Sequence, residues 1–113
     1  MTTLSLTVVD DDLAEVDRLS RELRNEVLAL DVDRAELVLA EAPAGAKADA
    51  GTVETVLVAL SASPVLVQLA GLLRDWVNRA NGRKIVVRDG DRSLELTGGS
   101  VDDNRAAIEK FFG

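Results

Sequence analysis

The pattern of hydrophobic and polar residues along the chain predicts a small domain of strands and helices. Between Leu4 and Val8, apolar side chains alternate with Ser or Thr, which is the period of a half-buried strand, so we expect a strand over residues 3–9. Apolar residues then recur at steps of three and four, which predicts an amphipathic helix over residues 12–30. The periodic positions of this helix are Leu13, Val16, Leu19, Leu23, Val27 and Leu30.

Residues 55–73 carry no charged side chain. Proline is disfavoured inside a helix but suits its first turn, and serine is a good N-cap, so Ser63 and Pro64 divide the run. We therefore predict two helices, 52–61 and 64–80. The second is apolar on most sides, which places it between other elements or against a partner.

The other elements follow from local signals. Residues 34–41 have the composition of a strand, and residues 42–51 form a loop of small residues. The segments KIVVR and RSLEL, joined through Asp-Gly-Asp at 89–91, predict a hairpin. Gly98-Gly99 ends its second strand, and a last short helix follows, capped by Ser100 or Asp102.

These elements give the order β-α-β-α-α-β-β-α in one domain spanning residues 1–113. We expect an α+β fold with a four-stranded mixed sheet and helices packed mainly on one face. The first two strands are expected to be parallel neighbours joined by a right-handed crossover.

Composition narrows the function. The 113-residue chain has a formal net charge of −7, so a phosphate backbone would be repelled and we expect no nucleic-acid binding. His, Cys and Tyr are absent, which removes the imidazole bases, thiol nucleophiles and soft metal ligands, and we expect neither an enzyme nor a cofactor. The N-terminus lacks a secretory signal, which favours a cytoplasmic protein. The uncharged run has polar interruptions and no aromatic belts, so we do not expect it to span a membrane.

The acidic triplet Asp10, Asp11 and Asp12 follows the first strand. Three carboxylates at the end of a strand are weak candidates for a Mg²⁺ site, and the segment resembles the opening acidic pair of a bacterial receiver domain. No aspartate ends a third strand, as a receiver requires. The simpler interpretation is that Asp11 or Asp12 caps the next helix, with Glu15 as the capping-box partner.

Two features could contact a partner. The first is a set of cations around the hairpin, which could receive an anionic ligand or an acidic surface or could simply be solvated: Arg83, Lys84, Arg88 and Arg92. The second is the helix 64–80, whose apolar residues exceed one face and could mediate homodimerisation. Its candidate interface residues are Leu66, Leu69, Leu73 and Trp76.

The whole pattern resembles the effector-associated constant component family of small actinobacterial proteins. Four stretches carry the resemblance: Glu41 to Pro43 with the Gly/Ala loop, Val56 to Ser61, Leu69 to Val77, and Val86 to Leu96. The chain departs from the family pattern at SASP, where a glycine-rich break is usual, and in having one arginine before Asp75.

The resemblance implies a non-catalytic component of bacterial conflict or immunity-like systems. Such components are encoded near effectors such as caspase-like or trypsin-like peptidases and NTP-dependent regulators. It therefore implies an adaptor with a protein partner of the peptidase-effector or NTPase type. The alternative from the residues themselves is a degenerate receiver-like or Mg²⁺-binding domain that uses Asp10 to Asp12.

Overall fold

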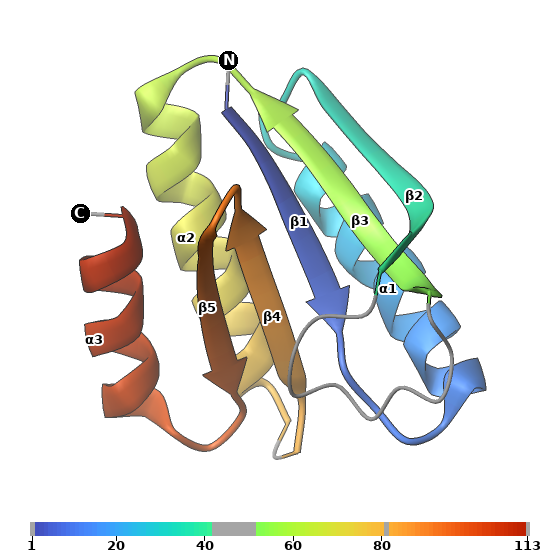
Figure 1. The fold of residues 1–113 in the computed structure, drawn as a ribbon. Helices are drawn as coiled ribbons and strands as arrows, with labels where there is room; N and C mark the ends of the chain where they lie inside the picture. Colours follow the sequence, from blue (N-terminus) through green and yellow to red (C-terminus); the bar gives the residue numbers. More distant parts are fainter. Residues whose placement is uncertain (1, 42–51, 81, 113) are drawn as a thin grey trace.

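The computed structural model describes residues 2–41, 52–80 and 82–112. Figure 1 shows a single sheet with helices behind it and at one side. The elements in chain order are β1 (Thr2–Val8), α1 (Leu13–Leu28), β2 (Arg34–Glu41), β3 (Thr52–Leu60), α2 (Ser63–Asn78), β4 (Lys84–Asp89), β5 (Arg92–Thr97) and α3 (Val101–Phe112).

The five strands lie in the order β2-β3-β1-β4-β5, and every neighbouring pair is antiparallel. β1 and β2 run in the same direction with β3 between them, and β3 and β4 run in the same direction with β1 between them. Two split β-α-β units therefore interlock, which is the ferredoxin-like arrangement. The β4–β5 hairpin and α3 extend this arrangement at one edge.

The α+β class is confirmed, but the predicted four-stranded mixed sheet is wrong because residues 52–60 form β3 rather than a helix. β3 lies between β1 and β2, so neighbouring strands satisfy its backbone on both sides. Val56 and Val58 face the helices, while Thr55 is buried on the other face. A strand that is buried on both faces has no simple alternation, and its β-branched residues suit the pleated sheet.

The expected parallel pairing of the first two strands is also wrong, since β3 separates them. An antiparallel sheet further excludes a receiver domain, whose doubly wound sheet is parallel. The predicted loop at 42–51 and the Asn81 helix stop lie outside the described residues. Among the described residues, no helix is long and apolar enough to cross a membrane.

The helices cover one face of the sheet, as expected. In Figure 1, α1 and α2 lie behind the strands, and α3 lies alongside β5. The core forms where α1 and α2 pack on the inward side chains of the central strands, and Trp76 is its largest fully buried side chain. The core residues of the three central strands are Leu4, Leu6, Val8, Val56, Val58, Leu60, Ile85 and Val87.

Helix boundaries agree with the predictions to within a few residues. Asp12 is the N-cap of α1, and its carboxylate accepts a hydrogen bond from the backbone N–H of Ala14 at 2.9 Å. Glu15 does not complete a capping box; it forms an ion pair with Arg18 instead. In α2 the cap is Ala62, without a side-chain hydrogen bond, so Ser63 is the first helical residue rather than the cap.

The hairpin turns at Gly90 and Asp91, because Asp89 pairs with Arg92. Gly90 has a φ of 61°, and no non-glycine residue in the described ranges has a positive φ. A positive φ at only the first central residue fits a type II′ turn rather than the type I′ turn that Asp-Gly favours. The hairpin prediction is confirmed, with the loop one residue later than the Asp-Gly pair.

A buried asparagine attaches α3 to the sheet. The Oδ1 atom of Asn104 accepts a hydrogen bond from the N–H of Thr97 at 3.1 Å, and its Nδ2 donates to the carbonyl of Thr97 at 2.8 Å. The same Nδ2 donates to Oδ1 of Asn78 in α2 at 3.0 Å. One side chain therefore joins β5, α2 and α3, and all of its hydrogen-bonding groups are used.

The turn at Gly98 packs directly on the end of α2. A Cβ atom added to Gly98 would lie 2.2 Å from the carbonyl oxygen of Ala80 and 2.6 Å from that of Val77. These are backbone atoms, so neither can rotate away, and the turn would have to separate from α2. Gly71, inside α2, has nothing within 4 Å of its added Cβ.

We predict that Gly98→Ala lowers the free energy of unfolding by about 2 kcal/mol, as overpacking against a fixed backbone does. Gly71→Ala is the matched control and should raise it by up to about 1 kcal/mol, since alanine favours a helix. Urea unfolding followed by Trp76 fluorescence measures both. Equal stability of Gly98→Ala and the parent chain would contradict the close packing.

Candidate interaction surface

One face of the sheet is covered by no helix among the described residues and faces the viewer in Figure 1, although Thr7, Thr55 and Val86 on this face are buried. We call it the open face. Because side chains alternate along a strand, it is formed by the residues between the core positions. Its described members are Thr3, Ser5, Thr7, Arg34, Glu36, Val38, Thr55, Leu57, Ala59, Lys84, Val86, Arg88, Ser93, Glu95 and Thr97.

The strand registers arrange these side chains in rows across the sheet. One row crosses all five strands and consists of Glu36, Leu57, Ser5, Arg88 and Ser93. The next contains the buried pair Thr7 and Thr55, whose hydroxyl oxygens are 3.2 Å apart in a hydrogen bond. A shallow hollow of about 220 Å³ lies at the end of the face, lined by Thr3, Asp33, Arg34, Leu57 and Ala59.

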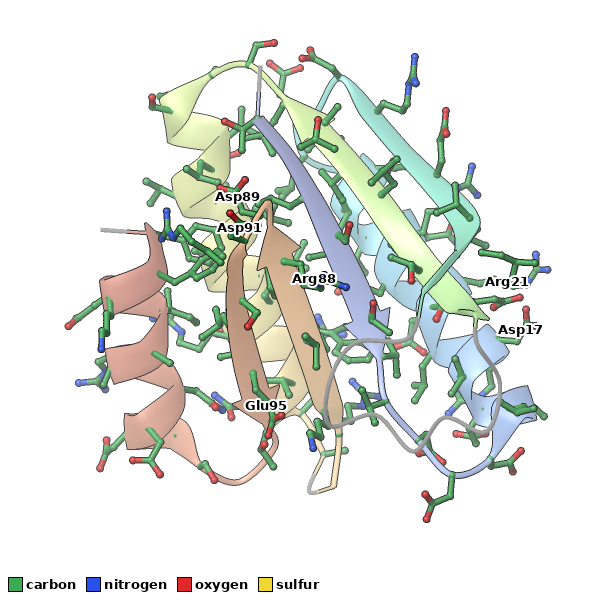
Figure 2. All side chains as sticks on the ribbon, viewed as in Figure 1. Asp17, Arg21, Arg88, Asp89, Asp91 and Glu95 are labelled. Atoms are coloured by element: carbon green, nitrogen blue, oxygen red, sulfur yellow. The ribbon has the colours of Figure 1, made fainter. Side chains whose placement is uncertain are left out.

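Arg88 has a distinct electrostatic position on the open face. Arg34 is neutralised by Glu36, with Nε and Oε1 3.3 Å apart, and Lys84 by Glu95, with Nζ and Oε1 3.4 Å apart. Arg88 has no ion pair with a described residue, and it is exposed. Figure 2 shows its side chain on the open face, away from the Asp89 and Asp91 carboxylates at the hairpin tip.

The neighbours of Arg88 are small hydroxyl groups. Ser5 lies opposite on β1 and Ser93 opposite on β5. Side chains in such cross-strand pairs lie about 5 Å apart at Cβ. A carboxylate arriving at this point would meet a guanidinium and two O–H donors, which is a charge-assisted arrangement suited to an acidic side chain.

The four cations predicted around the hairpin do not form one cluster. Arg83 lies on the Trp76 ring, with its guanidinium carbon 4.4 Å from the ring centroid, and donates to the Trp76 carbonyl. Arg92 lies over the Phe111 ring at 4.5 Å. Lys84 is paired with Glu95, so only Arg88 is presented singly on the open face.

The candidate interface on α2 is mostly in the core. Leu69, Leu73 and Trp76 are each 0% exposed, and Leu66 is partly buried. The sheet and the neighbouring helices cover this side of α2, so the first three side chains offer no surface to a partner in the folded chain. A substitution such as Leu69→Asp would therefore disrupt folding first. The exposed apolar residue of α2 is Val67, at 72%.

The acidic triplet acts as a turn and a cap. The Asp10 carboxylate accepts the N–H of Asp12 at 2.9 Å, and the Asp12 carboxylate accepts that of Ala14. Two of the three carboxylates are therefore occupied by local backbone hydrogen bonds. In the described part of the chain, no group of three His, Cys, Asp or Glu residues is arranged to hold a metal ion.

Comparison with protein-family models matches residues 8–111 to Effector Associated Constant Component 1. The chain belongs to this family. The family match covers nearly the whole chain and confirms the resemblance inferred from the sequence. Comparisons with curated proteins and with solved structures found no match. The description of the family, Effector Associated Constant Component 1, suggests a component of effector-associated systems.

This Effector Associated Constant Component 1 chain also contains a carboxyl group whose burial could not be seen in the sequence. Glu54, on β3, faces Asp17 and Arg21 of α1, and its Oε2 atom is buried without a hydrogen-bond partner. Figure 2 shows Asp17 and Arg21 side by side near the start of β3, and Arg21 Nε lies 3.1 Å from Asp17 Oδ1. Burial raises the pKa of Glu54, and the neighbouring Asp17 carboxylate adds to this shift while Arg21 opposes it.

Because the pKa of Glu54 is raised on folding, the folded chain binds this proton more tightly than the unfolded chain does. The contribution of Glu54 to stability therefore falls as the pH rises from about 4.3, the usual glutamate pKa, through the folded-state pKa. Above the folded-state pKa, the ionised group destabilises the contact between β3 and α1.

We predict that Glu54→Gln raises the free energy of unfolding at pH 7 by about 1 kcal/mol, because it removes a buried charge while keeping the shape. The gain should shrink as the pH falls through the folded-state pKa, and it should level off below about 4.3, the usual glutamate pKa, where Glu54 becomes protonated in both states. Urea unfolding across this pH range measures it. Glu109→Gln, on the exposed side of α3, controls for the loss of one negative charge. The same gain in both variants at pH 7 would contradict the assignment.

Proposed function

We propose that the chain is a non-catalytic adaptor that binds a protein of its effector-associated system through the open face. The observation that carries the proposal is Arg88, a cation without an ion pair among the described residues, set between Ser5 and Ser93 on a face that no helix covers. A binding role needs a rigid scaffold and a contact surface, and both are supplied by the sheet and its one-sided core.

The partner chemistry follows from the charges of the face. On this face Arg34 is paired with Glu36 and Lys84 with Glu95, so Arg88 is the cation that remains without an ion pair among the described residues. The chain as a whole has a net charge of −7. A partner would therefore place an acidic side chain at Arg88 and small or apolar groups over Leu57 and Ala59. Within effector-associated systems, a peptidase-type effector or an NTPase is the partner class that we propose.

The Mg²⁺-binding alternative has less support. Asp10 and Asp12 already accept backbone hydrogen bonds, and a cation at the triplet would compete with the cap of α1. The adaptor proposal uses no metal and no titratable catalytic group. It therefore agrees with the absence of His, Cys and Tyr from the sequence.

We predict that Arg88→Glu weakens partner binding by at least about tenfold, since it replaces a charge-assisted contact with a repulsive one. The tagged chain would be purified from the cells that carry its gene, and co-purifying proteins would be quantified by mass spectrometry. Arg74→Glu, at an exposed position on α2 in the other layer, is the matched control.

Support requires an effector-system protein that is recovered with the parent chain and with Arg74→Glu but lost with Arg88→Glu. Equal recovery with all three chains would refute the open face as the contact surface. Recovery of no partner with the parent chain would refute the adaptor function. The alternative occupant of the open face is a second copy of this chain, and light scattering on the purified chain tests it by measuring the molar mass. A dimer that Arg88→Glu dissociates would assign the open face to homodimerisation instead.

A further inference from the structure

The edge of β5 presents backbone groups that are available for pairing. The N–H and C=O of Thr97 bind the Asn104 side chain, so they point away from β4. Backbone groups in an antiparallel strand alternate in direction, so Ser93 and Glu95, at two-residue steps from Thr97, also point outward. Among the described residues, Asn104 satisfies only the last of these three positions. Ser93 and Glu95 retain the donors and acceptors that a further strand would use.

A groove lies between this edge and α3. It has a volume of about 340 Å³, and its lining combines apolar and polar side chains. Leu94, Ala107 and Phe111 supply the apolar part. The remaining lining residues are Arg92, Ser93 and Lys110.

Both ends of the groove are closed by contacts between α3 and β5. At one end Asn104 bonds to Thr97, and at the other Arg92 donates a hydrogen bond to the carbonyl of Phe111. The free edge between these two bridges is therefore short. A segment of a few residues in extended conformation fits this length, because each residue of a strand advances about 3.3 Å.

The lining of the groove carries two cationic side chains, Arg92 and Lys110, and no acidic one among the described residues, in a chain whose net charge is −7. The guanidinium of Arg92 is held in place by the Phe111 ring and carbonyl, and this contact uses only part of its donor set. Lys110 lies on the lining of the same groove, and no ion pair among the described residues involves it or Arg92. Glu95 is directed to the open face, where Lys84 neutralises it. The groove therefore favours a ligand that carries a carboxylate.

We propose that this groove binds a short extended acidic segment of a partner protein, which adds to β5 as a sixth strand. Backbone hydrogen bonds at Ser93 and Glu95 would hold the segment, and Arg92 and Lys110 would bind its carboxylate. This inference rests on the proposed adaptor function and names the chemistry of the partner segment. Ser93 borders both surfaces, so one partner can occupy the groove and the open face together.

Ser93→Pro tests the strand addition directly. Proline removes the outward N–H of Ser93 but takes no hydrogen bond from the β4–β5 ladder, and proline is tolerated on an edge strand with its nitrogen facing outward. Ser93→Ala removes the hydroxyl and keeps the N–H, so it is the matched control. Lys110→Gln removes one cation, and Arg105→Gln is its control at an exposed position on the same helix. Circular dichroism and thermal melting verify that each variant folds.

The probe is a random heptapeptide library displayed on phage, selected in parallel against the parent chain and each variant. We expect acidic peptides to be enriched by the parent chain and Arg105→Gln, and we expect Ser93→Ala, which keeps the N–H, to bind them more tightly than Ser93→Pro does. Synthetic copies of these peptides should bind Ser93→Pro at least about tenfold more weakly and Lys110→Gln about fivefold more weakly.

Enrichment of neutral or basic peptides, equal binding by Ser93→Pro, or no enrichment by the parent chain would each overturn the proposal. The outcomes also separate it from the adaptor function. If a co-purified partner bound Ser93→Pro and the parent chain equally, the groove would be refuted as the binding site, while the adaptor function would still be supported. If no partner co-purified with the parent chain, the adaptor function itself would be refuted.

Discussion

The two-residue alternation of side chains along β1, β3 and β4 is the constraint on which the rest of the molecule depends. At each of these strands, large aliphatic residues point to one face and pack against α1 and α2, with Trp76 at the centre of the contact. Burial of this apolar area is the main source of stability. The same alternation sends Ser, Thr and charged residues to the open face, where Thr7, Thr55 and Val86 are buried and Arg88 is exposed.

A shift of register by one residue in any central strand would exchange these two sets of side chains. A shift in β1, for example, would place Thr7 in the core and Leu6 on the open face, and it would break the hydrogen bond between Thr7 and Thr55. The register is therefore fixed by core packing, and it fixes in turn the row in which Arg88 lies between Ser5 and Ser93. Core packing therefore determines which side chains are neighbours on the open face.

Much of the fold could be predicted from local signals. β1, α1 and the hairpin were found because apolar and polar residues recur along each of them with a clear period. β3 was missed for the opposite reason: it lies between two strands and carries Thr55 and Leu57 on one face and Val56 and Val58 on the other, so its apolar run joins that of α2 without a visible break. The β-branched residues of this run were the available signal.

The candidate surfaces were harder to predict, because they depend on contacts between distant residues. Arg88 was recognised as one of four cations, but its isolation follows from the pairing of Lys84 with Glu95 and the packing of Arg83 and Arg92 on aromatic rings. The apolar residues of α2 suggested an interface because periodicity cannot tell which element covers a helix. Leu69 and Leu73 are covered by the rest of the same chain.

The two edges of the sheet differ in how they resist unwanted pairing. At β2, Arg24 of α1 donates from Nε to the carbonyl of Ala35 at 3.1 Å, and Arg34 and Glu36 place charges along the strand. Charged side chains of this kind discourage edge-to-edge association. At β5, a helix covers the edge: the Asn104 side chain of α3 bonds to the backbone of Thr97, and the Arg92 side chain of β5 donates to the carbonyl of Phe111.

Between those two bonds, α3 stands away from β5 far enough to leave the 340 Å³ groove. If α3 packed against β5 along its whole length, it would cover the edge fully and gain apolar contact. The spacing is instead kept open beside unpaired backbone groups, with Arg92 and Lys110 on its lining. Open spacing, unpaired backbone groups and two cations are the features that the proposed acidic segment would use, and the charged edge at β2 does not combine them.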